Sequence, residues 1–130
     1  MASPKRIKVG GGYFKGTQID VLGASGEYNV VITNTDGAAL NGLSIVPDGY
    51  GAGDTIKVEH IADLAGTGRV MAILAEDINN VGANSPIALD FTAAELVGTN
   101  ESLVVTYINT ASVAMNVYIV AEWIGVRKTA

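Results

Sequence analysis

The sequence contains 130 residues, of which 48% are hydrophobic and only 16% are charged, and its formal net charge is −5. This length fits one domain, and the absence of cysteine excludes disulfides and thiolate metal sites. Net acidity argues against direct nucleic-acid binding, and no apolar window is long enough to predict a membrane span. So few charges on a small domain favour a homo-oligomer or a subunit of an assembly.

Charge is divided unevenly along the chain. The first 19 residues hold four basic residues and no acid, whereas residues 20–126 hold all 13 acids against two basic residues. Pro4 resists helix formation, and the run Gly10–Gly12 favours irregular backbone. We therefore predict a flexible basic N-terminal arm over residues 1–18 and a β-rich body over residues 19–130. Fully extended, this arm reaches about 60 Å, far enough to contact a neighbouring subunit.

The arm is the predicted partner-binding site. Two adjacent aromatic residues, Tyr13 and Phe14, either anchor the arm in a partner's pocket, as interface aromatics often do, or fold back on the body. The surrounding basic residues orient the arm toward acidic neighbours, which include a second copy of the acidic body. The predicted binding residues are Lys5, Arg6, Lys8, Tyr13, Phe14 and Lys15.

The first half of the body carries strand patterns. Glu27–Thr33 alternates apolar and polar residues, as a half-buried strand does. Thr55–Ile61 alternates in the same way and places His60 on its apolar face. Val70–Ala75 is a continuous apolar run, long enough for a strand that is buried on both faces, although such a run does not identify one.

The next segment combines a strand with the one good helix start. Ile87–Phe91 is a short alternating strand. Thr92 and Glu95 then have the spacing of a capping box, and Gly98 is a plausible helix stop. We therefore predict one short helix of a turn or two.

The strongest strand patterns lie near the C-terminus, at Ser102–Ile108 and Val113–Ile124. The second of these has one continuous apolar face and a length of about 40 Å, at roughly 3.3 Å per residue. A strand of this length crosses a whole sheet or projects into a neighbour. The predicted oligomer interface consists of Val117, Ile119 and Trp123.

Short strands separated by glycine-rich turns favour a mostly β fold. The predicted architecture is a compact β-sandwich or β-barrel-like domain with one short helix and an extended N-terminal arm. No repeat of fixed period is present in the sequence.

No combination of residues predicts catalysis. His60 is the only histidine, and no motif supplies the positioned nucleophile and oxyanion donors of a triad, so a structural role is expected for it. Asp48 and Asp54, with glycines between them, could bind calcium through oxygen, but their spacing does not match an EF-hand loop. We therefore expect a non-enzymatic protein without a metal or cofactor.

The stretch from Arg69 to Phe91 carries a family resemblance. Val70–Asp77 reads V-M-A-I-L-A-E-D and is followed by Ile78-Asn79-Asn80, a glycine and the apolar Ile87–Phe91. This stretch resembles a segment of tailed-bacteriophage head decoration proteins, the small trimeric cement proteins on capsid exteriors. The resemblance covers about a fifth of the chain, and Ser102–Ile124 adds a long hairpin that the smallest members lack.

The resemblance implies a function and a location. The protein would bind the outer surface of an expanded capsid, bridge copies of the major capsid protein, and form a homo-oligomer, with a trimer as the expected form. It would be assembled in the host cytoplasm and reside on the virion exterior, and the basic arm would tie each subunit to the lattice. The alternative is a β-sandwich binding module, either lectin-like or associated with a virion fibre, for which Tyr50 and its glycine loop are the candidate site.

Overall fold

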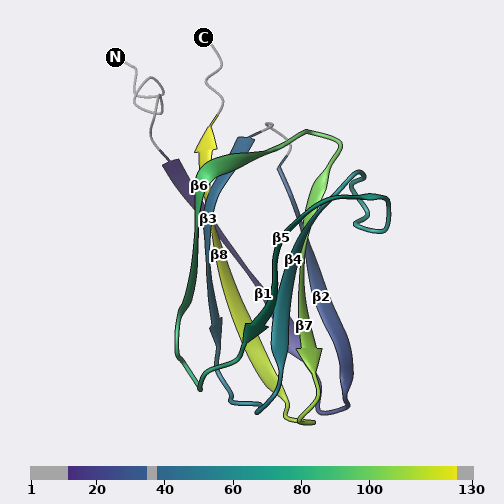
Figure 1. Ribbon diagram of the computed structural model, residues 1–130, viewed down its shortest axis with the longest axis vertical. Coiled ribbons are helices and arrows are strands. Elements are labelled where there is room, and N and C mark those ends of the chain that lie inside the picture. The colour runs from purple at the N-terminus through teal and green to yellow at the C-terminus, as the bar shows by residue number, and fades with distance from the viewer. Residues whose placement is uncertain (1–11, 35–37, 126–130) are drawn as a thin grey trace.

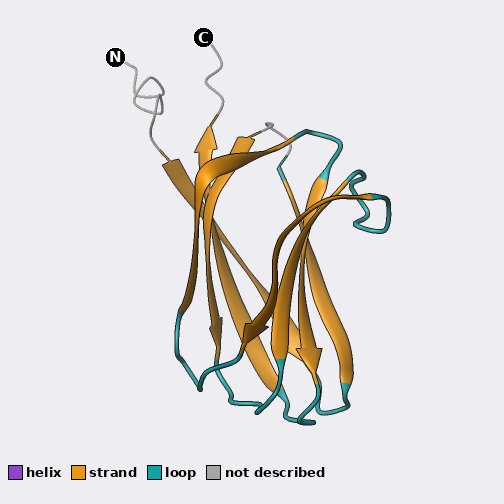
Figure 2. Ribbon diagram, in the orientation of Figure 1, coloured by secondary structure: helices purple, strands orange, loops and turns teal. Residues whose placement is uncertain are grey.

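The computed structural model describes residues 12–34 and 38–125, which form eight strands joined by short loops (Figure 1). Figure 2 shows strands and loops throughout this part of the chain, with no helix. None of the described residues therefore belongs to a helix that could span a membrane. The strands are β1 (Gly12–Val21), β2 (Gly26–Thr33), β3 (Ala38–Pro47), β4 (Thr55–Ile61), β5 (Val70–Asn79), β6 (Ile87–Val97), β7 (Ser102–Asn109) and β8 (Met115–Gly125).

The strands form two four-stranded antiparallel sheets, one with the order β1-β8-β3-β6 and the other with the order β2-β7-β4-β5. Apart from the β4–β5 hairpin, each consecutive pair of strands is divided between the two sheets, as Figure 1 shows for β6 and β7. This connectivity is that of a jelly roll. The predicted β-sandwich is therefore confirmed.

The core lies between the sheets and contains the inward-facing side chains of both. In β8, alternate residues from Met115 to Trp123 are buried, so the single apolar face expected for this strand is present. Along its length β8 pairs with β1 on one side and β3 on the other, so it crosses the whole sheet. Its apolar face packs against the core of the same chain.

This packing corrects the predicted oligomer interface. Val117, Ile119 and Trp123 are all 0% exposed and belong to the core of one subunit. An apolar strand face has the same sequence pattern whether it packs against the opposite sheet of its own chain or against another subunit. Here the second sheet covers it, so these three side chains do not reach the surface.

The predicted helix is wrong. Thr92 and Glu95 lie within β6, and Gly98 follows the end of that strand. The pairing of β3 with β6 is irregular here: Gly42 lies opposite Asp90, whereas Leu40 lies opposite Glu95. The side chain of Glu95 contacts His60 on β4. Pairing with β3 and this contact with the other sheet outweigh the local capping signal.

Residues 12–18 of the predicted arm belong to β1. They pair with β8 in register from Gly12, opposite Ile124, to Gln18, opposite Tyr118. The folded body therefore begins before the boundary expected from the glycine run. Lys5, Arg6 and Lys8 lie outside the described residues.

The apolar run in Val70–Ala75 is part of β5, which pairs with β4 alone and forms an edge of its sheet. Its register with β4 shifts at three places, and Val70, Met71 and Ile73 are exposed. Irregular pairing of this kind twists an edge away from a straight template and so discourages the addition of another strand.

Candidate functional site

The outer face of the β1–β8–β3–β6 sheet contains a shallow hollow of about 130 Å³. All four strands contribute to it, because their outward side chains lie in rows across the sheet. The lining residues are Phe14, Gly42, Leu43, Ser44, Ala88, Asp90, Val120 and Glu122.

Strand register explains the shape of the hollow. One row runs from Phe14 through Glu122 and Gly42 to Asp90. The next row, Gly16–Val120–Ser44–Ala88, is made mostly of small residues. The floor is therefore low at Gly42, between the carboxylates of Glu122 and Asp90, and along the neighbouring row of small residues.

Gly42 keeps this floor low for a steric reason. A β-carbon at position 42 would lie 2.9 Å from the carbonyl oxygen of Leu89, which is closer than such contacts normally come. The register of β3 with both β6 and β8 shifts between Leu40 and Gly42, so the backbone approaches closely at this bulge. A larger residue would push the strands apart and fill the hollow.

Phe14 is the most prominent apolar group at the site. It is 68% exposed, and Tyr118 and Val120 on β8 also leave apolar surface open on this face. The amide of Asn41 donates a hydrogen bond to Glu122 Oε1 at 3.3 Å. The site thus combines an aromatic ring with two carboxylates, a composition that can take part in stacking, apolar docking and hydrogen bonding.

The outer face of the other sheet is different. The β4–β5 loop folds over it, and a side chain at Gly66 in this loop would collide with Val31 and Val104. The loop is fixed by Asp63 Oδ1, which accepts hydrogen bonds from the backbone N–H groups of Gly66 and Thr67 at 2.8 and 3.1 Å. Part of that face is therefore covered within the chain.

The predicted binding residues in the described part of the chain point in different directions. The ring of Tyr13 packs against the core, and its hydroxyl accepts a hydrogen bond of 2.7 Å from the amide of Asn34. Phe14 faces outward, and Lys15 is exposed. Of the two aromatic residues, only Phe14 has its ring exposed to solvent.

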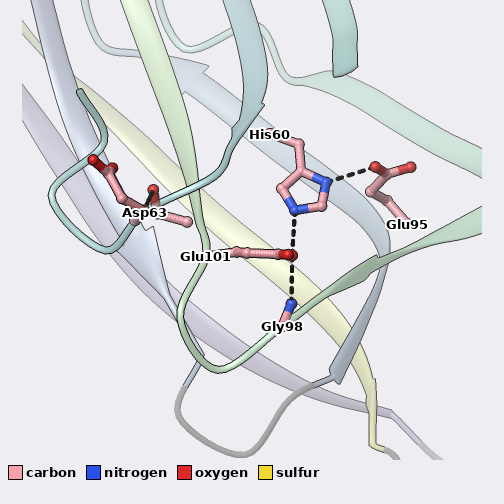
Figure 3. A network of polar contacts seen from close by, with 6 residues as sticks. His60, Asp63, Glu95, Gly98 and Glu101 are labelled. Carbon is pink, nitrogen blue, oxygen red and sulfur yellow. Dashed lines mark hydrogen bonds and ion pairs between the residues drawn. The ribbon is translucent and has the colours of Figure 1, made fainter. Parts of the chain in front are cut away.

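A second polar site surrounds His60, which is only 2% exposed (Figure 3). Its Nδ1 lies 2.7 Å from Oε2 of Glu95, and its Nε2 lies 2.8 Å from Oε1 of Glu101. The same oxygen of Glu101 accepts a hydrogen bond of 2.8 Å from the backbone N–H of Gly98. Both ring nitrogens are therefore engaged by carboxylates.

The pKa of Glu101 lies below its ordinary value. The main cause is the hydrogen bond from the Gly98 N–H, and the hydrogen bond with His60 adds to it. Burial opposes the shift, and the positive charge of Arg69 supports it. Glu101 is therefore held in its ionised form.

The glycine loop between Asp48 and Asp54 ends in a hydrogen-bond network around the fully buried Asp54. Oδ1 accepts hydrogen bonds from Thr110 N, Thr110 Oγ1 and Ala111 N at 2.7, 3.0 and 2.9 Å, and Oδ2 accepts one from the Tyr107 hydroxyl at 2.6 Å. Burial raises the pKa of Asp54, but these hydrogen bonds outweigh it and leave the pKa lowered. Protein donors thus occupy the oxygens that calcium would need.

Other candidate chemistry is limited in the described ranges. They contain no group of three or more His, Cys, Asp or Glu residues that could hold a metal ion. Asp48 lies elsewhere on the loop and accepts a hydrogen bond of 2.8 Å from the backbone N–H of Asn116. Tyr50 is exposed on the glycine loop.

No protein-family model matches the sequence, and no curated protein sequence matches it. Among solved structures, the chain is similar to VP2 of infectious bursal disease virus, with a TM-score of 0.46 and 11% identity over 88% of this chain. It spans only 33% of that VP2 chain.

Two other solved structures are similar to the chain. One belongs to the capsid asymmetric unit of cyanophage Pam1, with a TM-score of 0.41 and 15% identity over 85% of this chain and 84% of that one. The other is the CBM36-1 domain of a multidomain xylanase from the hindgut metagenome of Trinervitermes trinervoides, with a TM-score of 0.37 and 9% identity over 88% of this chain and 100% of that one. At such identities, none of these likenesses assigns a function.

Proposed function

We propose that this protein is a virion structural protein that decorates a capsid exterior and stabilises the expanded shell by binding several copies of the major capsid protein. The observation that carries the proposal is the hollow on the outer sheet face, above which Phe14 is 68% exposed. Exposed apolar surface around an aromatic anchor is typical of a protein-binding site.

The proposed mechanism is thermodynamic linkage between binding of this protein and expansion of the capsid. A protein that binds the expanded lattice more tightly than the unexpanded one shifts the equilibrium toward expansion by mass action. A homo-oligomer, with a trimer as the expected form, would place several copies of the Phe14 face on neighbouring capsid subunits. Its contacts would then act together with avidity, so each one can be weak.

The basic residues before β1 would supply a second attachment. Lys5, Arg6 and Lys8 precede the strand that carries Phe14, so a tether through them would begin beside the hollow. Lys15 is exposed on the same strand and would add to the attraction toward acidic partners. We infer no enzymatic activity, which agrees with the engagement of both nitrogens of the sole histidine.

A second candidate function rests on the same hollow. An aromatic ring beside the hydroxyl of Ser44 and the carboxylates of Asp90 and Glu122 offers both a stacking surface and hydrogen-bonding groups. These are the groups with which a β-sandwich module could hold a saccharide. The second candidate is therefore a carbohydrate-binding module.

The decisive experiment is co-sedimentation of Phe14→Ala with cognate capsids in the expanded and unexpanded states. We expect the wild type to bind the expanded form, and the variant to bind at least about fivefold more weakly, because loss of an aromatic anchor at an interface costs more than about 1 kcal/mol.

Leu22→Ala is the matched control, because Leu22 is 64% exposed on the loop after β1, away from the hollow. The control should bind as the wild type does. Equal capsid binding by Phe14→Ala and wild type would refute the proposed role of the hollow. Saccharide binding on a glycan array, without capsid binding, would favour the second candidate.

A further inference from the structure

The hydrogen bonds that His60 can make depend on the protonation state of its ring. A neutral imidazole has one N–H donor and one nitrogen lone pair, whereas an ionised carboxylate only accepts hydrogen bonds. Here Nδ1 and Nε2 lie 2.7 and 2.8 Å from oxygens of Glu95 and Glu101. Only the doubly protonated ring can donate to both oxygens.

The three residues come from parts of the fold that are otherwise separate. His60 points inward from β4 in one sheet, and Glu95 points inward from β6 in the other. Glu101 belongs to the turn between β6 and β7, where its backbone N–H donates to the Gly98 carbonyl at 3.1 Å. The ring therefore joins both sheets and this turn, and Figure 3 shows it between the carboxylates of Glu95 and Glu101.

The end of β6 depends on this junction more than a regular strand would. Its pairing with β3 is interrupted between Asp90 and Glu95, so Glu95–Val97 pairs with β3 as a short separate segment. Short segments at a sheet edge open more easily than long central ones. His60 gives this segment a link to the opposite sheet.

We propose that His60 is a proton-operated clamp: when doubly protonated it holds the end of β6 and the Gly98–Glu101 turn against β4, and when it loses a proton it releases them. This inference concerns regulation of the fold and does not depend on the proposed capsid function. Histidine suits such a role because it changes charge near neutral pH.

The charged groups around the ring determine which protonation state closes the clamp. Glu95 faces it from β6 and Glu101 from the turn, and Arg69, in the β4–β5 loop, acts electrostatically on Glu101. Asp63, from the same loop, directs its carboxylate to backbone N–H groups of that loop. The two contacting carboxylates favour the protonated ring.

The remaining charges of the packed strands lie elsewhere. On β4, Lys57 and Glu59 form a pair at 3.7 Å on the opposite face of the strand. Glu76 and Asp77 on β5 lie near Ile56, at the other end of the β4–β5 ladder. The described parts of β3 and β7 contain no charged residue.

Loss of the ring proton would leave one nitrogen lone pair facing a carboxylate, so the clamp should be weaker when the ring is neutral. At acid pH, Glu101 sets the limit, because the Gly98 N–H and His60 lower the pKa of its carboxyl group. The stability that ionised Glu101 contributes to the fold is therefore lost only as the pH falls through that lowered pKa. The clamp is therefore closed while the ring of His60 is doubly protonated and Glu101 is ionised.

The test uses the full chain, in which the single histidine gives one set of imidazole signals. In ¹⁵N NMR at pH 6, we expect both ring nitrogens to be protonated. Between pH 6 and pH 9, the ring and the Gly98 amide proton should titrate together, and the midpoint of thermal unfolding should fall by about 5 °C. A single neutral tautomer at pH 6 would overturn the proposal.

Variants separate the clamp from other pH effects. Glu95→Gln should reduce the fall in the unfolding midpoint between pH 6 and pH 9, and His60→Gln should abolish it. Glu59→Gln, on the opposite face of β4, is the matched control and should keep the wild-type fall. An equal fall in Glu95→Gln and wild type would overturn the proposal even if His60→Gln does not fold.

Discussion

At the scale of single residues, the network around Asp54 determines which side chains the adjoining loop can accept. Asp54 is buried and uses both carboxylate oxygens for hydrogen bonds, so it cannot move without breaking them. Asn80 adds a hydrogen bond of 2.7 Å to the Tyr107 hydroxyl, and burial together with Asp54 raises the pKa of that tyrosine. The loop is thus fixed by polar groups that have little freedom to adjust.

Gly51→Ala should destabilise the protein for this reason. The new β-carbon would collide with the Asp54 carboxylate, whose position is set by its four hydrogen bonds. We expect a loss of about 1–3 kcal/mol in the free energy of unfolding, as is usual for overpacking. Urea denaturation followed by tryptophan fluorescence provides the measurement.

Gly23→Ala is the appropriate comparison. A β-carbon at Gly23 meets no atom within 4 Å, and the backbone there does not require glycine. The change should be neutral or should stabilise the protein by about 0.4–1 kcal/mol through the unfolded state. Equal losses in the two variants would show that Asp54 does not restrict the loop.

At the scale of elements, β8 has two faces with different roles. Its inward residues complete the core, whereas Tyr118 and Val120 between them are exposed beside the hollow. A single strand therefore both stabilises the fold and presents the candidate site. Substitutions at adjacent positions should separate these roles.

Ile119→Ala should cost about 2–5 kcal/mol of stability, because it removes a fully buried branched side chain and leaves a cavity. Val120→Ala should change stability by no more than about 0.5 kcal/mol, because Val120 is 39% exposed. Chemical denaturation of both variants checks this. A large loss in Val120→Ala alone would place the core on the opposite face of β8.

The elements also show which features the sequence could predict. The alternation in Val113–Ile124 correctly predicts a long strand with one buried face, because period-two burial is a local property. The capping-box spacing of Thr92 and Glu95 is local too, but it predicts the wrong structure. The partner of Glu95 is His60, 35 residues away, and no local pattern contains that contact.

The candidate site was predictable only in part. The sequence singles out Tyr13 and Phe14 together and leaves open whether they face a partner or the body, and only the structure shows that Phe14 is the exposed one of the two. Its neighbours Glu122 and Asp90 come from distant strands, and only the register of four strands places them in one row. Register depends on pairing across the whole sheet, so the hollow has no signature in any single segment.

At the scale of the whole molecule, two polar sites lie near opposite ends of β4. Asp54 immediately precedes the strand, and His60 lies close to its end. The first is a network of hydrogen bonds that joins loops to Tyr107 on β7, and the second joins the two sheets through the ring of His60. The sandwich thus combines an apolar core with a hydrogen-bonded network at one end of β4 and, at the other end, the histidine that we propose as a clamp.

β1 carries Phe14 of the candidate site and directly follows residues 1–11 in the chain. Deletions that end before β1 or within it can therefore distinguish an effect on folding from an effect on capsid attachment. Deletion of residues 2–16 removes Gly12–Gly16 from the ladder with β8, and with it the hydrogen bond between Tyr13 and Asn34. We expect this deletion to lower the free energy of unfolding by several kcal/mol, since it exposes the edge of β8 and part of the core. Deletion of residues 2–11 keeps every described strand and should leave the midpoint of thermal unfolding unchanged.

The same two deletions test the tether. If Lys5, Arg6 and Lys8 contribute to attachment, the shorter deletion should bind expanded capsids more weakly than the full chain while it remains folded. The loss should shrink at high salt, because the interaction of exposed charges is screened. Undiminished capsid binding at low salt by a folded protein without residues 2–11 would assign attachment to the Phe14 face alone.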